Sequence, residues 1–451
     1  MFMKTLLFTT AVCFICGSLA VQTPYEPKWE SLDARPCPSW YTDAKFGIFI
    51  HWGVYSVPAW GPKGKYAEWY WSSMQNKSAE TWAFHKEMYG EDFQYPNFAA
   101  DFKAELFEPQ QWAELFNRSG AKYVVLTSKH HEGYCLWPST HSFGWNSVDL
   151  GSGRDLLGEL TEAVRSRGIK MGYYYSLYEW FNPLYKNDLS KYVENHMLPQ
   201  LTELVEKYQP ALIFADGEWN HHSSDWKSES FLAWLFNKSS VKDEVVVNDR
   251  WGKDCRSRHG GYYTTEYGKV DVHGTELTQE KPWEECRGIG SSFGYNRNES
   301  LEDYQSSQEL IHMLIKLVSS GGNFLLNVGP TADGRIPVIM QQRLIDIGKW
   351  LEVNGEAIYS SAPAKGLKSN NSIRFTQKEN YLYAICLEWP GKQLKLDSIV
   401  CPKDTEIKLL GTETALPWQE AGNGIVVDLS SLGPNNLPCE YAYTFKIKLS
   451  K

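Results

Sequence analysis

The chain has 451 residues, so its length predicts two or three domains, or one barrel with an appended domain. Hydrophobic residues make up 42% and charged residues 22%, a globular composition that argues against intrinsic disorder. The formal charge of −9 argues against a nucleic-acid partner, because such proteins present a basic face. Aromatic residues make up an unusual 14%, which favours either a large core or a ligand with flat faces.

The first twenty residues have the layout of a secretory signal peptide. Lys4 supplies a positive charge, an apolar run follows from Leu6 to Cys16, and residues 18–20 are suited to cleavage. The run is too short to span a membrane and no other stretch is long enough, so we expect no membrane anchor. These features predict a mature chain that enters the secretory pathway, for delivery to the lysosome or for export.

Cysteines and glycosylation signals fit this route. Seven cysteines remain after the signal peptide, with no Cys-x-x-Cys pair among them. This predicts no structural zinc site and at least one free or intermolecular thiol. Five Asn-x-Ser sequons are candidate glycosylation sites, namely Asn76, Asn117, Asn237, Asn298 and Asn370.

Between residues 21 and 360, short apolar runs alternate with longer helical patterns. The runs predicted as strands are 46–50, 123–127, 170–176, 211–215, 244–248, 262–266, 284–289 and 323–328. The helical patterns lie at 157–167, 191–207, 229–236, 308–318 and 341–353. Near-continuous apolar strands are typical of a parallel sheet covered on both faces, so the pattern predicts an α/β fold, a (β/α)8 TIM-like barrel. Residues 361–451 instead show short alternating strands, which predict a small all-β sandwich domain.

Polar and aromatic residues follow six of the predicted strands. The carboxyl ends of the strands form the active site in a (β/α)8 barrel, so these residues are expected to lie together. They include His51, His130, His131, Tyr175, Asp216, Trp219, Arg250 and Glu266. Six strand ends with such side chains predict one functional site.

Several longer segments resemble the α-L-fucosidases of glycoside hydrolase family 29. They are AKFGIFIHWGVYSVPAW, AEWYW, YVVLTSKHHEGYCLWPS, GYYYSLYEW, LIFADGEW, VVVNDRWG, HGGYYTTE and GGNFLLNVGPTADGRIP. The resemblance covers almost the whole mature chain and is strongest to the animal tissue enzymes. It implies a retaining exo-glycosidase that releases terminal α-L-fucose from glycoproteins, glycolipids or oligosaccharides through a covalent fucosyl-enzyme. It further implies that the enzyme needs no cofactor and forms homo-oligomers.

The resemblance implies that Asp216 is the nucleophile, and a carboxylate at a strand end suits attack on an anomeric carbon. Two carboxylates compete for the acid/base role. Glu266 has the position that the barrel alignment implies. Glu284 lies in KPWEEC, which is similar to the Lys-Trp-Glu-x-Cys signature of the family but is interrupted by Pro282. The geometry required of a retaining pair favours Glu266, with a raised pKa beside an ionised Asp216, and Glu284 is the alternative.

Fucose offers three hydroxyl groups for hydrogen bonds and one methyl group for an apolar slot. His, Glu and Arg side chains suit the hydroxyls, whereas Trp and Phe suit the methyl group. The fucose-binding positions that the resemblance implies are His51, Glu68, Trp69, His130, His131, Tyr175, Arg250 and Phe293. One departure is Phe214, since the family commonly has a Trp two residues before the nucleophile, so an indole hydrogen bond is lost here.

Two other functions fit parts of the pattern. A metal-dependent hydrolase would use His51, His130, His131 and Asp216 as ligands, but the paired ligand expected on its first strand is missing, so we predict no metal site. An inactive, secreted fucose-binding protein would be expected to have lost the nucleophile, and Asp216 is intact. Fucosylated glycans are therefore the expected partners.

Overall fold

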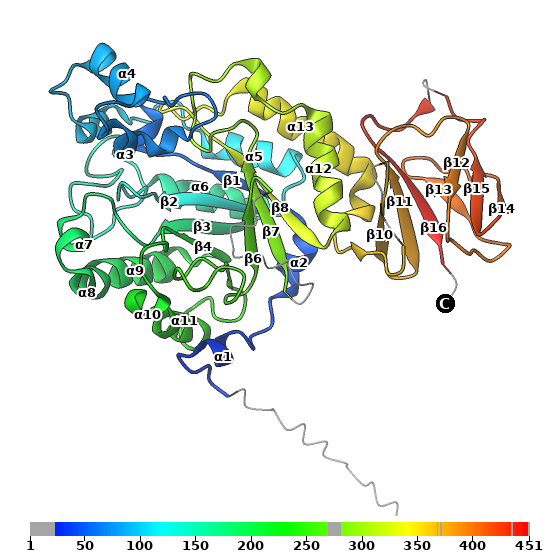
Figure 1. The fold of residues 1–451 in the computed structure, drawn as a ribbon, viewed down its shortest axis with the longest axis horizontal. Coiled ribbons are helices and arrows are strands. Elements are labelled where there is room, and N and C mark those ends of the chain that lie inside the picture. Colours follow the sequence, from blue (N-terminus) through cyan, green and yellow to red (C-terminus); the bar gives the residue numbers. More distant parts are fainter. Residues whose placement is uncertain (1–22, 269–280, 368, 370–371, 434–435, 450–451) are drawn as a thin grey trace, which may run out of the picture.

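The computed structural model describes residues 23–268, 281–367, 369, 372–433 and 436–449 (Figure 1). The predicted signal peptide and the Asn370 sequon lie outside these residues. Eight parallel strands form one curled sheet, in the order β5-β4-β3-β2-β1-β8-β7-β6. Their bounds are β1 Phe46–Ile50, β2 Tyr123–Lys129, β3 Lys170–Ser176, β4 Leu212–Asp216, β5 Val246–Val247, β6 Tyr263–Glu266, β7 Trp283–Gly288 and β8 Gly322–Val328. The predicted barrel-like parallel sheet is confirmed.

The edge strands β5 and β6 are joined by a short set of hydrogen bonds. The backbone N–H groups of Gly261 and Tyr262 donate to the Val247 carbonyl oxygen at 3.0 and 3.3 Å. The Asp249 Oδ1 atom accepts from the Thr264 N–H at 3.2 Å and from its hydroxyl at 2.7 Å. A carboxylate thus takes the place of backbone pairing just beyond β5, which explains why this strand has two residues where the sequence predicts five.

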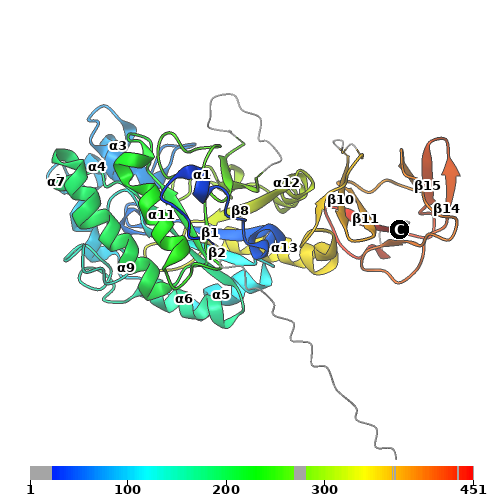
Figure 2. The ribbon, with the colours of Figure 1, turned by 90° about the horizontal axis from the view of Figure 1, so that it is seen from below.

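Helices cover the outer face of the curled sheet (Figure 2). Their bounds are α1 Trp29–Leu32, α2 Ser39–Ala44, α3 Tyr70–Met74, α4 Glu80–Tyr89, α5 Pro109–Arg118, α6 Leu156–Ser166, α7 Pro183–Asn187, α8 Leu189–Tyr192, α9 Leu198–Tyr208, α10 Ser223–Trp226, α11 Ser228–Asn237, α12 Ser307–Ser319 and α13 Val338–Asn354. In α6, for example, Asp155 caps the first turn by accepting from Gly158 N–H, and Leu156, Leu160 and Val164 recur every four residues on the buried face. A helix occupies each of the five predicted positions.

The C-terminal strands form two antiparallel sheets, in the orders β13-β16-β11-β10-β9 and β12-β15-β14. Their bounds are β9 Ala362–Pro363, β10 Ile373–Lys378, β11 Tyr381–Cys386, β12 Gln393–Leu396, β13 Ile407–Leu409, β14 Trp418–Ala421, β15 Gly424–Asp428 and β16 Tyr443–Lys448. Leu382 of one sheet and Val427 of the other share an apolar core. The predicted all-β C-terminal region is confirmed.

The β11 strand joins the two parts of the molecule. Because successive side chains point to opposite faces, Leu382 and Ala384 enter the C-terminal core, whereas Tyr383 and Ile385 enter the core of the barrel region. The indole N–H of Trp350 on α13 donates to the Ala442 carbonyl at 2.9 Å. The five-stranded sheet therefore lies beside α12 and α13, as both ribbon views show.

The described residues also bear on the secretory features. All seven cysteines after the signal peptide are free thiols. Asn76 and Asn117 are exposed. The side-chain amide of Asn237 donates to the Tyr25 carbonyl at 2.8 Å, and that of Asn298 donates to the Gly61 carbonyl at 3.1 Å. Within the described ranges, no helix is both long and apolar enough to cross a membrane.

Candidate active site

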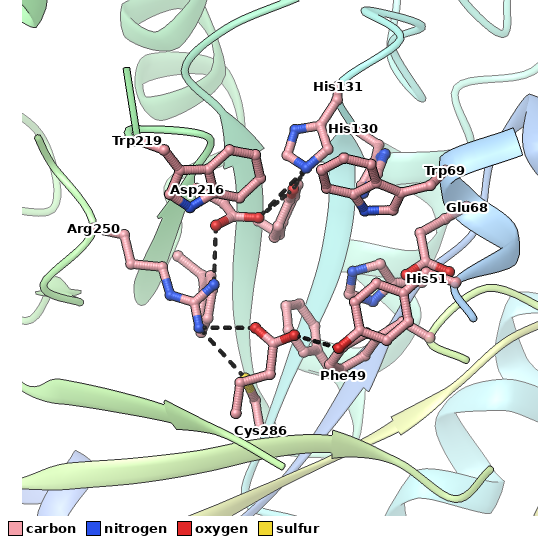
Figure 3. Close-up of a pocket in the computed structure, with 15 residues that line it drawn as sticks. Phe49, His51, Glu68, Trp69, His130, His131, Asp216, Trp219, Arg250 and Cys286 are labelled. Atoms are coloured by element: carbon pink, nitrogen blue, oxygen red, sulfur yellow. Dashed lines mark hydrogen bonds and ion pairs between the residues drawn. The ribbon is translucent and has the colours of Figure 1, made fainter. Parts of the chain in front are cut away.

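A pocket lies at the carboxyl ends of the parallel strands (Figure 3). It is lined by Phe49, His51, Tyr66, Glu68, Trp69, His130, His131, Tyr174, Phe214, Asp216, Trp219, Arg250, Glu266, Cys286 and Phe293. These residues come from strand ends and from the loops that follow them. Nearly all of the predicted catalytic and binding residues are brought together here, and the exceptions are Tyr175 and Glu284.

Asp216, the last residue of β4, is a buried carboxylate surrounded by hydrogen-bond donors. Its Oδ1 atom accepts from Arg250 Nη1 at 2.9 Å, and its Oδ2 atom accepts from the Tyr174 hydroxyl at 2.8 Å. The guanidinium of Arg256 lies 3.8 Å from Oδ1. Burial opposes ionisation, but the combined effect of Arg250, His131 and Arg256 outweighs it, and the pKa of Asp216 lies well below its ordinary value. Asp216 is therefore ionised and held in one orientation.

Arg250 connects Asp216 to a second carboxylate, Glu266, at the end of β6. Arg250 Nη2 lies 3.3 Å from Glu266 Oε2, and the hydroxyl of Tyr66 donates to Glu266 Oε1 at 2.8 Å. The Glu266 side chain is 26% exposed, whereas the Arg250 side chain is 3% exposed. A molecule that enters the pocket can therefore meet a partly accessible carboxyl group at Glu266 and a deeper carboxylate at Asp216.

His51 and His131 are neutral hydrogen-bonding groups of the pocket. Burial, aided by the nearby His130, lowers the pKa of His51 to about 3. Asn327 uses its amide N–H to bond the Phe293 carbonyl at 2.6 Å, so its Oδ1 atom accepts from His51 Nδ1 at 2.7 Å. This leaves His51 Nε2 as an acceptor. Burial likewise places the pKa of His131 well below its ordinary value.

A buried glutamate and a set of aromatic rings complete the walls. Glu68 Oε2 accepts from the Gly294 N–H at 2.8 Å, and burial raises the pKa of Glu68. The ring of Phe49 lies 5.0 Å from that of Phe214 and 6.2 Å from that of Phe293, measured between centroids. The Arg250 guanidinium lies 4.9 Å from the Phe214 centroid, so this ring supports the cation that binds Asp216. The lining of the pocket thus combines an apolar group of three phenylalanine rings with charged and polar side chains.

The prediction of Tyr175 as a pocket residue is wrong by one position. Tyr175 is fully buried, and its hydroxyl donates to Gln200 Oε1 at 2.8 Å, on the helix side of β3. Tyr174 occupies the pocket wall instead. Adjacent residues of a strand point to opposite faces, and both faces of β3 are buried, so hydrophobicity did not distinguish the two tyrosines.

Glu284 lies in the barrel interior but does not line the pocket. It is completely buried, and its Oε2 atom accepts from the hydroxyls of Tyr41, at 3.0 Å, and Tyr123. Burial raises the pKa of Glu284 to about 7, although the tyrosine hydrogen bonds oppose the shift. The structure therefore separates the two carboxylates that competed in the sequence, with only Glu266 at the pocket.

Four pocket residues were not among the predicted site residues: Phe49, Tyr66, Tyr174 and Cys286. Trp219 follows Asp216 closely, and Tyr66 belongs to a loop after β1 that precedes Glu68. The position of Trp219 after a strand end made it a predicted site residue, whereas nothing in the local sequence distinguishes Tyr66 from other loop tyrosines.

The described part of the chain contains no group of three His, Cys, Asp or Glu side chains arranged to hold a metal ion. His131 Nε2 lies 3.7 Å from Asp216 Oδ2, and His51 is bonded to Asn327. The hypothesis of a metal-dependent hydrolase therefore gains no support from the geometry of these residues.

Comparison with known proteins agrees with the geometry. The profile of the family described as alpha-L-fucosidase matches residues 12–356, and that of the alpha-L-fucosidase C-terminal domain matches residues 368–448. The tissue alpha-L-fucosidases of Bos taurus and Homo sapiens are 47% and 46% identical over 434 and 435 residues, each match covering 94% of this chain and 91% of the relative. The crystal structure of Thermotoga maritima alpha-fucosidase with a mechanism-based inhibitor is 36% identical, with a TM-score of 0.81 over 94% of this chain and 100% of that chain. The chain belongs to the α-L-fucosidase family of glycoside hydrolases, family 29.

Proposed function

We propose that the protein hydrolyses terminal α-L-fucosides with retention of anomeric configuration. The observation that carries this proposal is the pair of carboxylates joined by Arg250, one of them buried and ionised at Asp216, the other partly exposed at Glu266. Two carboxyl groups on either side of a glycosidic bond are the chemical requirement of this reaction. Membership of the fucosidase family supplies the identity of the sugar.

Asp216 acts as the nucleophile in the first step. Its carboxylate oxygen forms a bond to the anomeric carbon while the bond from that carbon to the departing oxygen breaks. Glu266 donates its proton to the departing oxygen. The product of this step is a fucosyl ester of Asp216, and the rest of the glycan leaves as an alcohol.

Water completes the reaction in the second step. The ionised Glu266 takes a proton from water as the water oxygen attacks the anomeric carbon, and the ester bond to Asp216 breaks. Glu266 is thereby protonated again and Asp216 is again a carboxylate. Since Glu284 is sealed among tyrosines away from the pocket, we assign the acid/base role to Glu266.

The walls of the pocket fit the two sides of fucose. His51, Glu68, His130 and His131 offer donors and acceptors to the sugar hydroxyls, and Trp69 adds an indole N–H. Phe49, Phe214 and Phe293 form the apolar wall for the methyl group. The substrates in this proposal are glycoproteins, glycolipids or oligosaccharides with terminal fucose, met in the lysosome or outside the cell, and the active protein is a homo-oligomer.

The test is hydrolysis of an aryl α-L-fucoside followed by proton NMR. We expect release of the phenol, with α-L-fucose as the first anomer to appear, and unchanged activity after exhaustive chelation. The β-anomer as first product would overturn retention, and loss of activity on chelation would favour the metal-dependent hydrolase. Fucose binding without any hydrolysis would identify the protein as an inactive binding protein.

A further inference from the structure

Trp219 is an exposed aromatic ring at the rim of the pocket. It is 36% exposed and lies beside Asp216 in Figure 3. The other large apolar side chains that are exposed in the described ranges do not line this pocket. Single exposed apolar side chains are common on protein surfaces, so the informative feature of Trp219 is its position at the mouth of the pocket.

The Trp219 ring is held in place by contacts with other rings. It stacks on Trp69 at 5.8 Å between centroids and an angle of 27°. The edges of His131 and Tyr178 contact it at 5.3 and 5.7 Å. Trp180 in turn packs against Trp69 at 5.3 Å. A ring held in this way loses little conformational freedom when a ligand stacks on its free surface.

The backbone between Asp216 and Trp219 is also fixed. Gly217 has φ of 78°, and a Cβ atom at this position would lie 2.4 Å from the Tyr178 ring. Glu218 is buried and accepts from Arg256 Nε at 2.6 Å. This rigid turn sets the position of the indole relative to the Asp216 carboxylate, three residues earlier in the chain.

The chemistry of the rim differs from that of the pocket floor. Asp216, Arg250 and Glu266 are charged residues that line the pocket, whereas Trp219 presents a partly exposed, flat apolar surface at its rim. An indole face packs well on the C–H face of a pyranose ring. The matching ligand is a neutral pyranose.

We propose that Trp219 forms a second subsite, outside the fucose pocket, for the neutral pyranose to which the fucose is attached. The subsite rests on the proposed function, because its occupant is the leaving group of that reaction. Stacking on Trp219 orients the departing oxygen toward Glu266. Trp219 is therefore a specificity-determining residue that separates glycan substrates from fucosides with a minimal leaving group.

The test compares two substrates in wild-type protein and in Trp219→Ala. One is α-L-fucosyl fluoride, whose leaving group is a single atom, and the other is a disaccharide of α-L-fucose and a neutral hexopyranose. We expect the ratio of kcat/KM for disaccharide to kcat/KM for fluoride to fall about 10-fold in Trp219→Ala. Trp219→Phe keeps a flat ring and is expected to change this ratio less than about 3-fold.

Phe143→Ala is the matched control, because Phe143 is 91% exposed and does not line the pocket. It should leave both activities unchanged.

The subsite is overturned if Trp219→Ala lowers kcat/KM equally for both substrates, because Trp219 then acts on the fucose unit. It is also overturned if inhibition by free fucose weakens by the same factor as kcat/KM for the disaccharide. An unchanged ratio would also overturn it. Wild-type protein inactive on both substrates would refute the proposed function itself. If Trp219→Ala fails to fold, Trp219→Leu provides the same comparison.

Discussion

Glu266 and Glu284 lie on the neighbouring strands β6 and β7, at two different levels of the same barrel. In the register of these strands Glu266 is opposite Cys286, and Glu284 is opposite Thr264. Glu284 thus lies two residues deeper, roughly 7 Å along the strand. The upper glutamate is bonded to Arg250 at the pocket, and the lower one is enclosed by the phenol groups of Tyr41 and Tyr123.

The difference shows how depth in the barrel decides what a carboxyl group can do. At the upper level the carboxyl group of Glu266 contacts Arg250 and is partly exposed, so a molecule in the pocket can reach it. At the lower level phenols satisfy one oxygen, and burial raises the pKa of Glu284 to about 7. The raised pKa of Glu284 thus reflects its burial and does not place it at the pocket, whereas Glu266 at the strand end lines the pocket.

The largest effect should come from replacing Asp216, the buried carboxylate of the pocket. We expect Asp216→Gly to lower kcat by about 10⁴-fold or more, because the step that forms the fucosyl ester is lost. Added azide should restore turnover of an activated aryl fucoside by attacking from the vacated side. The product, identified by NMR, should be the inverted β-L-fucosyl azide. Substantial activity without azide would remove Asp216 from the nucleophile role.

The next prediction compares the same substitution, glutamate to glutamine, at Glu266 and at Glu284. Glu266→Gln should lower kcat/KM for a fucosyl disaccharide by about 10²- to 10³-fold, because the departing oxygen no longer receives a proton. Glu284→Gln keeps an oxygen for both phenol hydrogen bonds and should remain within about 10-fold of wild type. Azide should give the retained α-L-fucosyl azide with Glu266→Ala. A larger loss in Glu284→Gln than in Glu266→Gln would exchange the two assignments.

Sequence patterns predicted the barrel and most of the site for a physical reason. Apolar runs followed by polar residues identify strand ends, and the ends of parallel strands meet, so His51, Asp216 and Arg250 were expected to lie together. The patterns could not determine which side chain of β3 faces inward, because both faces of that strand are buried. They also could not place Tyr66, which reaches Glu266 from a loop whose path depends on tertiary contacts.

The buried Glu284 should control how the free energy of unfolding depends on pH. The pKa of Glu284 is raised from 4.5 to about 7 in the folded protein, so its protonated form is favoured there. Its stabilising contribution is complete below about pH 4.5 and is lost as the pH rises through about 7, a change of roughly 3 kcal/mol. In Glu284→Gln this loss should be absent. Urea unfolding between pH 4.5 and 8 measures it, and parallel curves for the two proteins would contradict the prediction.

The smallest effect compares adjacent tyrosines of β3. Tyr174→Phe removes the hydroxyl that donates to Asp216 Oδ2 at 2.8 Å, and we expect kcat to fall about 10-fold. Tyr175→Phe removes the hydroxyl that donates to Gln200, on the opposite face of the strand. It should leave kcat unchanged and lower the free energy of unfolding by about 1 kcal/mol, because Gln200 loses a buried partner. Steady-state kinetics and urea unfolding of both variants test this, and a larger loss of kcat in Tyr175→Phe would show that the pocket is formed by the other face of β3.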